Sequence, residues 1–273
     1  MDAVKGRPST DRAALFSTIV ILAAVLALGG ASWARNWVWS TPVSLWSDIA
    51  AKSPMKARAH YNLATSLSAA GKLHEAMDEN LKTIALNPGY GKAYFNIGAI
   101  LHAWGRVDEA IEKYMTALAL KPDIAEARNN LGFAYYSKGM YGEAIEQYSL
   151  AIRIKPGHAK AHLNRGHALR AKGELDEAMA DYRRALALRP DYAAARQGIG
   201  QTLLLKGMFN EAAGEFRAAI DMDPRLVDAR TGLGEALLAL GMRMEAASEF
   251  ETALALDPAN EKAAQGFAKT RAF

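Results

Sequence analysis

The chain has 273 residues, of which 51% are hydrophobic, and it carries a formal net charge of +4. This composition allows a large buried core, and the charge is too small for its length to indicate a nucleic-acid-binding protein. The chain has no cysteine, which excludes disulfides, thiol catalysis and cysteine-ligated zinc and leaves the cellular compartment open.

An apolar stretch without any charged residue runs from Ala13 to Trp33, after a polar segment over residues 1–12. At 1.5 Å per residue, a helix over this stretch spans about 31 Å, close to the thickness of a bilayer's hydrocarbon core. Three basic residues precede it: Lys5, Arg7 and Arg12. By the positive-inside rule, we expect a transmembrane helix over 13–33, a cytoplasmic tail over 1–12 and an extracytoplasmic remainder, on the periplasmic side of a bacterial inner membrane.

Four of the five tryptophans follow within a short distance: Trp33, Trp37, Trp39 and Trp46. Indole rings favour a membrane–water interface, which supports the anchor. The alternative is a signal peptide cleaved before Arg35, because Ser32 and Ala34 are small residues at the positions that a signal peptidase reads. Another alternative is a buried core helix.

An internal repeat of 34 residues fills most of the chain. Its prolines recur at a constant spacing: Pro54, Pro88, Pro122, Pro156, Pro190, Pro224 and Pro258. With proline as position 32, six complete repeats run over 57–90, 91–124, 125–158, 159–192, 193–226 and 227–260.

Four other positions hold small or aromatic residues in register. Positions 3 and 20 are always alanine, position 15 is always glycine, position 8 is Ala64 and then glycine, and position 24 is Asn80 and then Tyr or Phe. This pattern resembles the tetratricopeptide repeat, a helix–turn–helix unit. The resemblance implies an all-α, right-handed superhelical solenoid. The glycine at position 15 is expected to end the first helix in a left-handed conformation, and the proline to stop the second.

Two further helices are expected to cap the solenoid. Residues 43–53 align with the second helix of a repeat, with Trp46 at position 24, so an interfacial linker and a capping helix are predicted within 34–56. Residues 261–273 are predicted to form a C-terminal capping helix with Ala263, Ala264 and Phe267 inward.

The junction between the apolar stretch and the first repeat is similar to the tail of the transmembrane-and-tetratricopeptide family of protein O-mannosyltransferases. The similarity rests on seven residues: Arg35, Asn36, Leu45, Trp46, Lys52, Pro54 and Arg58. This chain lacks the many membrane helices that carry glycosyl transfer in that family, so the resemblance implies at most an accessory role beside a polytopic glycosyltransferase.

An asparagine recurs at position 6 of the first four repeats: Asn62, Asn96, Asn130 and Asn164. In this fold, positions 2, 5, 6, 9, 12 and 13 face the concave surface, so the four amides are expected to form a ladder. An amide offers one acceptor and two donors, which matches a peptide group. The ladder resembles that of the repeat domain of O-linked N-acetylglucosamine transferase, which implies binding of extended polypeptide. The alternative is that these asparagines are consensus residues satisfied by their neighbours.

The other concave positions of repeats one to four are basic or aromatic. They are Arg58, Tyr61, Lys92, Phe95, His102, Asn129, Phe133, Tyr136, Lys160, His167 and Arg170, with Glu126 the one acid. An acidic or C-terminal peptide would suit them. In repeats five and six position 6 becomes Gly198 and Gly232, and we expect that half to be structural or to form a separate apolar contact.

No constellation for catalysis is present in the sequence: no Ser–His–Asp arrangement, phosphate loop or paired carboxylates. His158 and His162 have metal-pair spacing, but packing is the favoured role of His162. Arg165 replaces the usual leucine at position 7 and is predicted to pair with Asp181 at position 23. No cofactor or metal is expected.

The sequence therefore predicts a non-enzymatic, membrane-anchored scaffold that binds extended polypeptide and does not bind nucleic acid. Two alternatives remain open. In the first, the chain is an accessory subunit that presents substrates to a membrane protein glycosyltransferase. In the second, it is an assembly factor for secretion, pili or envelope complexes.

Overall fold

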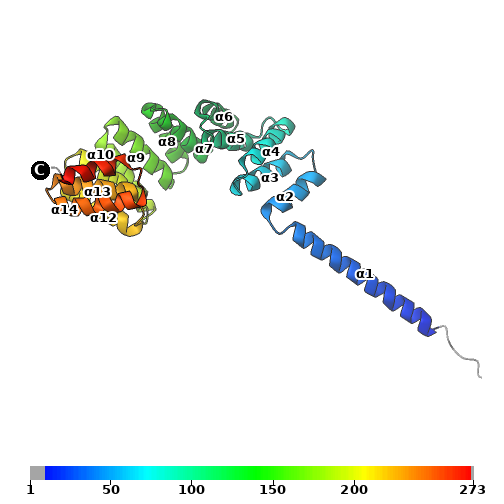
Figure 1. Ribbon diagram of the computed structural model, residues 1–273. Helices are drawn as coiled ribbons and strands as arrows, with labels where there is room; N and C mark the ends of the chain where they lie inside the picture. Colours follow the sequence, from blue (N-terminus) through cyan, green and yellow to red (C-terminus); the bar gives the residue numbers. More distant parts are fainter. Residues whose placement is uncertain (1–9, 272–273) are drawn as a thin grey trace, which may run out of the picture. The chain divides into compact units, whose positions relative to one another are not determined.

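The computed structural model describes residues 10–271, and the side chains of residues 10–14, 31, 32 and 34–38 lie outside the description. The predicted cytoplasmic tail over 1–12 thus falls almost wholly outside it. The described residues form α-helices joined by short turns (Figure 1). In chain order they are α1 (Thr10–Val38), α2 (Pro42–Lys52), α3 (Ala57–Ala69), α4 (Leu73–Leu86), α5 (Gly91–Ala103), α6 (Val107–Leu120), α7 (Ala125–Ser137), α8 (Tyr141–Ile154), α9 (Ala159–Lys172), α10 (Leu175–Leu188), α11 (Ala193–Leu205), α12 (Phe209–Met222), α13 (Val227–Ala239), α14 (Arg243–Leu256) and α15 (Glu261–Arg271).

Each 34-residue repeat contains one pair of helices, from α3 and α4 in the first to α13 and α14 in the sixth. The glycine at position 15 separates the two helices of a pair, and all six of these glycines have a positive φ, between 73° and 87°. Residues with side chains rarely adopt this conformation, so the invariant glycine is explained.

The chain divides into two compact units, 1–96 and 97–273, and each is described separately. In the first unit, helix α2 packs on α3 as the predicted N-terminal cap. A capping box begins α2. The Thr41 hydroxyl accepts a hydrogen bond from the backbone N–H of Ser44, and the Ser44 hydroxyl accepts one from the backbone N–H of Thr41, both at 3.1 Å. Trp39 donates its indole N–H to Asp48 of this helix at 3.1 Å.

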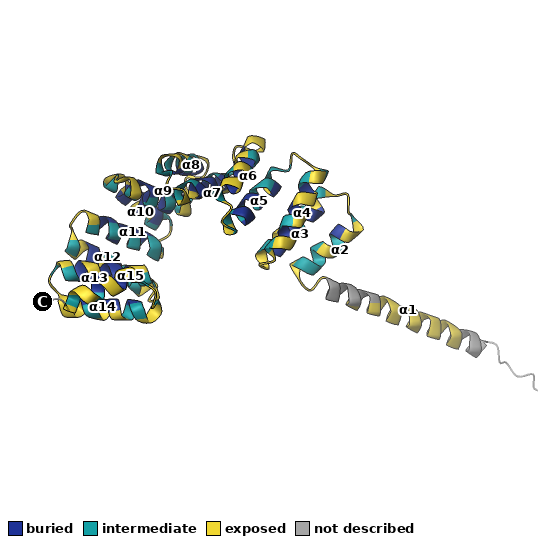
Figure 2. Ribbon diagram, turned by 45° about the horizontal axis from the view of Figure 1, so that its top comes forward, coloured by how far each residue is buried: buried dark blue, intermediate teal, exposed yellow. Residues whose placement is uncertain are grey.

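Helix α1 carries large apolar side chains that are exposed between residues 15 and 30, where each is 51% to 70% accessible (Figure 2). No helix among the described residues is both long and apolar enough to cross a membrane. The transmembrane helix predicted over 13–33 includes side chains that lie outside the description, those of 13, 14, 31 and 32. The span is therefore not supported by the described residues and stays a prediction.

In the second unit, alanines and aromatic rings form the core between the helices. The aromatic residue at position 24 is fully buried in each of its repeats: Tyr114, Tyr148, Tyr182, Phe216 and Phe250. The glycine at position 8 of the same repeat lies directly beneath the ring, since a Cβ atom there would approach it to 2.7–2.8 Å. The two helices of a pair can thus cross closely, as the small residues predict.

The same rings also contact position 6 of the fifth and sixth repeats, where glycine stands in place of the ladder asparagine. The glycines that replace asparagine at position 6 touch the aromatic ring of the preceding repeat. A Cβ atom on Gly198 would lie 2.7 Å from Tyr182, and one on Gly232 would lie 2.4 Å from Phe216. Each of these two rings therefore sits between two glycines, and a larger residue at position 6 would require the ring to shift.

Candidate functional site

The predicted groove residues of the second unit come together on one face of α7 and α9, which are packed against each other. Phe133 is the most exposed aromatic residue of this face, at 45%, and Lys160 is exposed as well. The remaining members are half-buried apart from Asn129, which is buried: Asn130, Tyr136, Asn164, His167 and Arg170. We call these eight residues the α7–α9 face.

Three asparagines of this face form a chain of hydrogen bonds. Asn164 donates its amide N–H to Oδ1 of Asn129 at 3.0 Å, and Asn129 donates to Oδ1 of Asn130 at 3.3 Å. Asn130 in turn hydrogen-bonds to the hydroxyl of Tyr114. Asn129, only 2% exposed, therefore holds the two ladder amides in place. The Asn164 side chain has no other hydrogen bond among the described residues, so its carbonyl and second N–H stay available.

Two pairs of aromatic rings include members of this face. The rings of His102 and Phe133 lie 5.1 Å apart, and those of His167 and Tyr182 lie 5.3 Å apart. Nδ1 of His167 also hydrogen-bonds to the Tyr182 hydroxyl at 2.9 Å. Two buried nitrogen atoms next to this face, Nε2 of His102 and Nε of Arg170, have no hydrogen-bond partner in the described part of the chain.

Burial controls the ionisation of these side chains. Burial, with a smaller contribution from the charge of Arg170, lowers the pKa of His167 to about 4, so the ring is neutral at pH 7. Burial likewise lowers the pKa of His102 and raises that of Tyr182 to about 12. The positive charge of the face at neutral pH thus comes from Lys160 and Arg170. Glu126, the single acid predicted nearby, is paired with Lys155 at 3.2 Å.

The first unit carries the other five predicted site residues. Arg58 and Lys92 are exposed, and Asn62, Phe95 and Asn96 are half-buried. The ring of Tyr61 lies 4.9 Å from that of Tyr90. The five site residues belong to α3 and to the beginning of α5, and they are described only within this unit.

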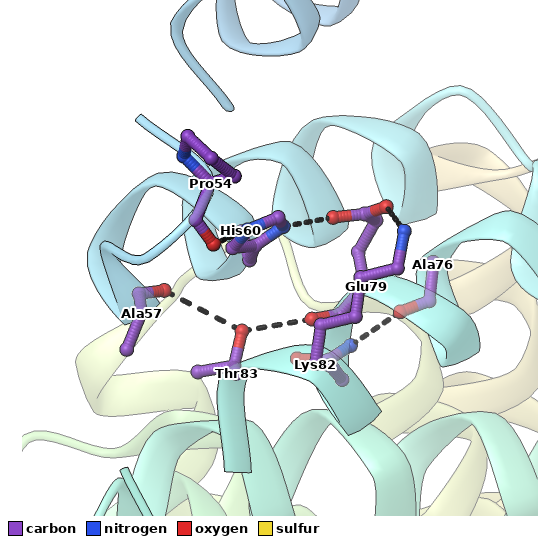
Figure 3. A network of polar contacts seen from close by, with 8 residues as sticks. Pro54, Ala57, His60, Ala76, Glu79, Lys82 and Thr83 are labelled. Atoms are coloured by element: carbon purple, nitrogen blue, oxygen red, sulfur yellow. Dashed lines mark hydrogen bonds and ion pairs between the residues drawn. The ribbon is translucent and has the colours of Figure 1, made fainter. Parts of the chain in front are cut away.

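A second set of polar pairs, at positions 4 and 23, was not predicted as a set. Figure 3 shows the pair of the first repeat, in which Nδ1 of His60 lies 2.5 Å from Glu79 and Nε2 lies 3.0 Å from the carbonyl oxygen of Pro54. Four other repeats pair the same positions at 2.9–3.0 Å: Arg128 with Gln147, His162 with Asp181, Arg196 with Glu215 and Arg230 with Glu249. These pairs could have been predicted from the sequence, because a cationic or polar residue at position 4 is followed nineteen residues later by its acceptor at position 23 in each of these repeats.

The pair of the fourth repeat also contains the predicted ion pair. Arg165 donates Nε and Nη2 to the carboxylate of Asp181 at 2.6 and 2.8 Å, which confirms that prediction. His162 is buried, at 6% exposed, in keeping with the packing role expected for it, and its ring also contacts Asp181 at 2.9 Å and the carbonyl oxygen of Pro156 at 3.4 Å. Both ring nitrogens of His162 are thereby engaged, which disfavours it as a metal ligand.

Two family models match the repeats. The family described as TPR repeat matches residues 98–139, 134–169 and 166–207, and that described as tetratricopeptide repeat matches 198–261. Together they cover more than half of the chain. The chain belongs to the tetratricopeptide repeat family. Members of this family are typically non-catalytic scaffolds that bind other proteins, and this tetratricopeptide repeat protein shares their all-α solenoid fold.

Several solved structures share the fold. YrrB, a TPR protein with an unusual peptide-binding site, is 26% identical over 70% of this chain and 97% of its own, with a TM-score of 0.55. PilW, a type IV pilus biogenesis factor, is 23% identical over 77% of this chain and 97% of its own, with a TM-score of 0.70.

The Cut9–Hcn1 structure from the APC/C gives a TM-score of 0.75 at 18% identity. Its alignment covers 84% of this chain but only 45% of the other chain. Because the sequence identities to PilW and to Cut9–Hcn1 are low, the similarity to these two structures concerns the fold alone. No curated protein sequence matches this chain significantly. The predicted resemblances to the O-mannosyltransferase tail and to the O-linked N-acetylglucosamine transferase ladder stay predictions.

Proposed function

We propose that this protein is a non-catalytic scaffold that binds an extended polypeptide segment on the α7–α9 face. The observation that carries the proposal is the amide chain from Asn130 through Asn129 to Asn164. A fixed amide with a free carbonyl and a free N–H can bind a peptide group of any sequence. Because Asn129 already restricts Asn164, little side-chain freedom is lost on binding.

The charge of this face selects the kind of segment. Lys160 and Arg170 leave it positive, and the nearby acid is already paired with Lys155. An acidic segment or a C-terminal carboxylate is therefore the favoured ligand. The exposed ring of Phe133 adds a contact for an apolar side chain of the same segment. YrrB, with its peptide-binding site, supports this choice among the functions open to the fold.

We also propose that α1 anchors the scaffold in a membrane, with the repeats on the extracytoplasmic side. The exposed apolar side chains between residues 15 and 30 support this, because a helix that is apolar on all sides requires an apolar environment. The exposed Trp33, at 70%, would then lie near the membrane–water interface.

The decisive experiment is photo-crosslinking from position 133 in the full-length protein. A photoreactive phenylalanine replaces Phe133, in the wild-type background and with Asn130→Ala and Asn164→Ala. We expect a discrete crosslinked polypeptide that is lost in the double variant while the helical CD spectrum is unchanged. Asn210→Ala is the matched control, because Asn210 is an exposed asparagine on α12 without a hydrogen-bond partner in the described part of the chain.

A crosslink that persists in the double variant would reject the amides as a peptide clamp. The asparagines would then have the structural role left open by the sequence, since each is already satisfied in part by a neighbour. The partner's identity from mass spectrometry would separate a glycosyltransferase substrate from a component of an envelope assembly.

A further inference from the structure

A hollow lies at the C-terminal end of the second unit, between α13 and α15. It has a volume of about 500 Å³. Its lining includes Glu235 and Leu238 of α13, and Lys262, Gln265 and Lys269 of α15. In the numbering of the repeat, these are positions 9 and 12 of the sixth repeat and positions 2, 5 and 9 of the helix that follows. They are thus positions predicted to face the concave surface.

The floor of this hollow is apolar. The fully buried ring of Phe250 lies beneath Gly266, where a Cβ atom would come within 2.4 Å of the ring. Leu238, half-buried, forms part of the wall. The floor and the wall together offer a place for one apolar side chain of a ligand.

The rim of the hollow carries charged side chains that form no ion pair among the described residues. Lys262 and Lys269 are both exposed, and neither forms an ion pair within the described residues. Most other lysines of the second unit with such exposure are engaged, as Lys138 is with Asp108 and Lys155 is with Glu126. Glu235 is the only acid of the lining, so the hollow keeps a net positive charge. The two lysines belong to α15, which follows the sixth repeat, so the expectation that repeats five and six are structural or form a separate apolar contact stays a prediction.

The spacing of the two lysines defines the ligand. They are seven residues apart on α15, which places them on the same face of the helix and about 10.5 Å apart along its axis. A peptide in the polyproline II conformation, which is extended, has three residues per turn and advances about 3.1 Å per residue, so side chains three residues apart lie on the same face and about 9 Å apart, close to the spacing of the two lysines. Gln265 lies between the two lysines and can exchange hydrogen bonds with the backbone of such a chain.

We infer that this hollow is a second peptide site, which binds an extended segment with two carboxylates three residues apart. Lys262 and Lys269 each bind one carboxylate, Gln265 binds the backbone between them, and an apolar side chain enters toward Leu238 and Phe250. The second carboxylate is either an acidic side chain or the C-terminus of the segment. The site is separate from the α7–α9 face and does not rest on the function proposed for it.

The test uses fluorescein-labelled peptides and the full-length protein in detergent micelles. Acetylated and amidated peptides carry two aspartates separated by zero to five residues, with a leucine between them where the spacing allows. We expect the tightest binding by fluorescence anisotropy at two intervening residues. Lys262→Gln and Lys269→Gln should each weaken it about threefold, and Glu235→Gln should strengthen it. Raising the salt concentration should weaken it further.

Two more arms complete the design. A peptide with one aspartate three residues before a free C-terminus, compared with its amide, distinguishes the two sources of the second carboxylate. Lys121→Gln is the matched control, because Lys121 is exposed and unpaired among the described residues. Lys160→Gln reports on the α7–α9 face.

Three outcomes would overturn the inference: no binding, equal binding at all spacings, or binding unchanged by the substitutions at Lys262 and Lys269. Binding lost in Lys160→Gln but kept in the other two variants would support the function proposed for the α7–α9 face and reject the second site. Binding lost only in Lys262→Gln and Lys269→Gln would establish the second site whatever the fate of the first.

Discussion

The guanidinium of Arg165 and the carboxylate of Asp181 form a bidentate ion pair, with hydrogen bonds of 2.6 and 2.8 Å, in the middle of the repeat array. Asp181 is 4% exposed and also binds the ring of His162 at 2.9 Å. Arg165 extends the network by donating Nη1 to the Ser149 hydroxyl at 3.0 Å. The network around this buried carboxylate connects α8, α9 and α10, and removal of the carboxylate affects both of its donors, His162 and Arg165.

The first prediction concerns this network. Asp181→Asn should lower the free energy of unfolding by about 3 kcal/mol, because it leaves Arg165 and His162 without their charged acceptor. Arg165→Leu combined with Asp181→Gln recreates the Leu131 and Gln147 pair of the third repeat and should recover at least half of that loss. Urea denaturation followed by CD measures both. A loss in Asp181→Asn no larger than in Glu109→Gln, at an exposed ion pair, would contradict the prediction.

The second prediction concerns the glycine at position 6 of the sixth repeat. Gly232→Ala should destabilise the protein by about 1–3 kcal/mol, because the added Cβ would lie 2.4 Å from the buried ring of Phe216. Gly214→Ala is the matched control within α12. Nothing lies within 4 Å of its Cβ position, so this alanine should stabilise by about 0.5–1 kcal/mol. Thermal melts of both variants should shift in opposite directions, and a shift in the same direction would show that the ring has room to move.

The period of the sequence was sufficient to predict the helix pairs, since proline at position 32 and glycine at position 15 act through the local backbone alone. Position 15 illustrates this, because a positive φ needs no knowledge of distant residues. The ion pair of Arg165 with Asp181 was also predictable, because the repeat fixes which positions of its two helices face each other.

The amide chain was not predictable in the same way. The sequence indicates that Asn130 and Asn164 share a face, but the hydrogen bond between Asn164 and Asn129 depends on side-chain rotamers in two different repeats. Asn129 was expected to face a ligand and is instead 2% exposed. The close approach of Gly198 to the Tyr182 ring likewise depends on how deeply that ring enters the next repeat, which only the packing reveals.

The third prediction concerns pH. The pKa of His167 is about 4 in the folded protein and about 6.5 in an unfolded chain, so the unfolded state binds more protons between these values. The contribution of this residue to stability is therefore complete above pH 6.5 and is lost as the pH falls toward 4, by up to about 3 kcal/mol. His167→Gln keeps a hydrogen-bond acceptor for Tyr182 but does not titrate. Denaturation from pH 7 to pH 4 should show a smaller loss of stability in the variant, and an equal loss in both would refute the assignment.

The fourth prediction concerns α1. If this helix anchors the protein, the full-length chain should remain in the membrane pellet after alkaline carbonate extraction of its host cells. Val20→Arg combined with Ala24→Arg should release it, because arginine near the centre of a membrane helix costs about 2.5–3.5 kcal/mol per residue.

The mass of the mature protein then separates the anchor from the signal peptide, because cleavage before Arg35 would remove the first 34 residues. A wild-type protein of full length in the carbonate-soluble fraction would reject both interpretations. In that case the exposed apolar side chains between residues 15 and 30 would have to be covered by another protein surface, and the repeats would lose the membrane location that we propose for them.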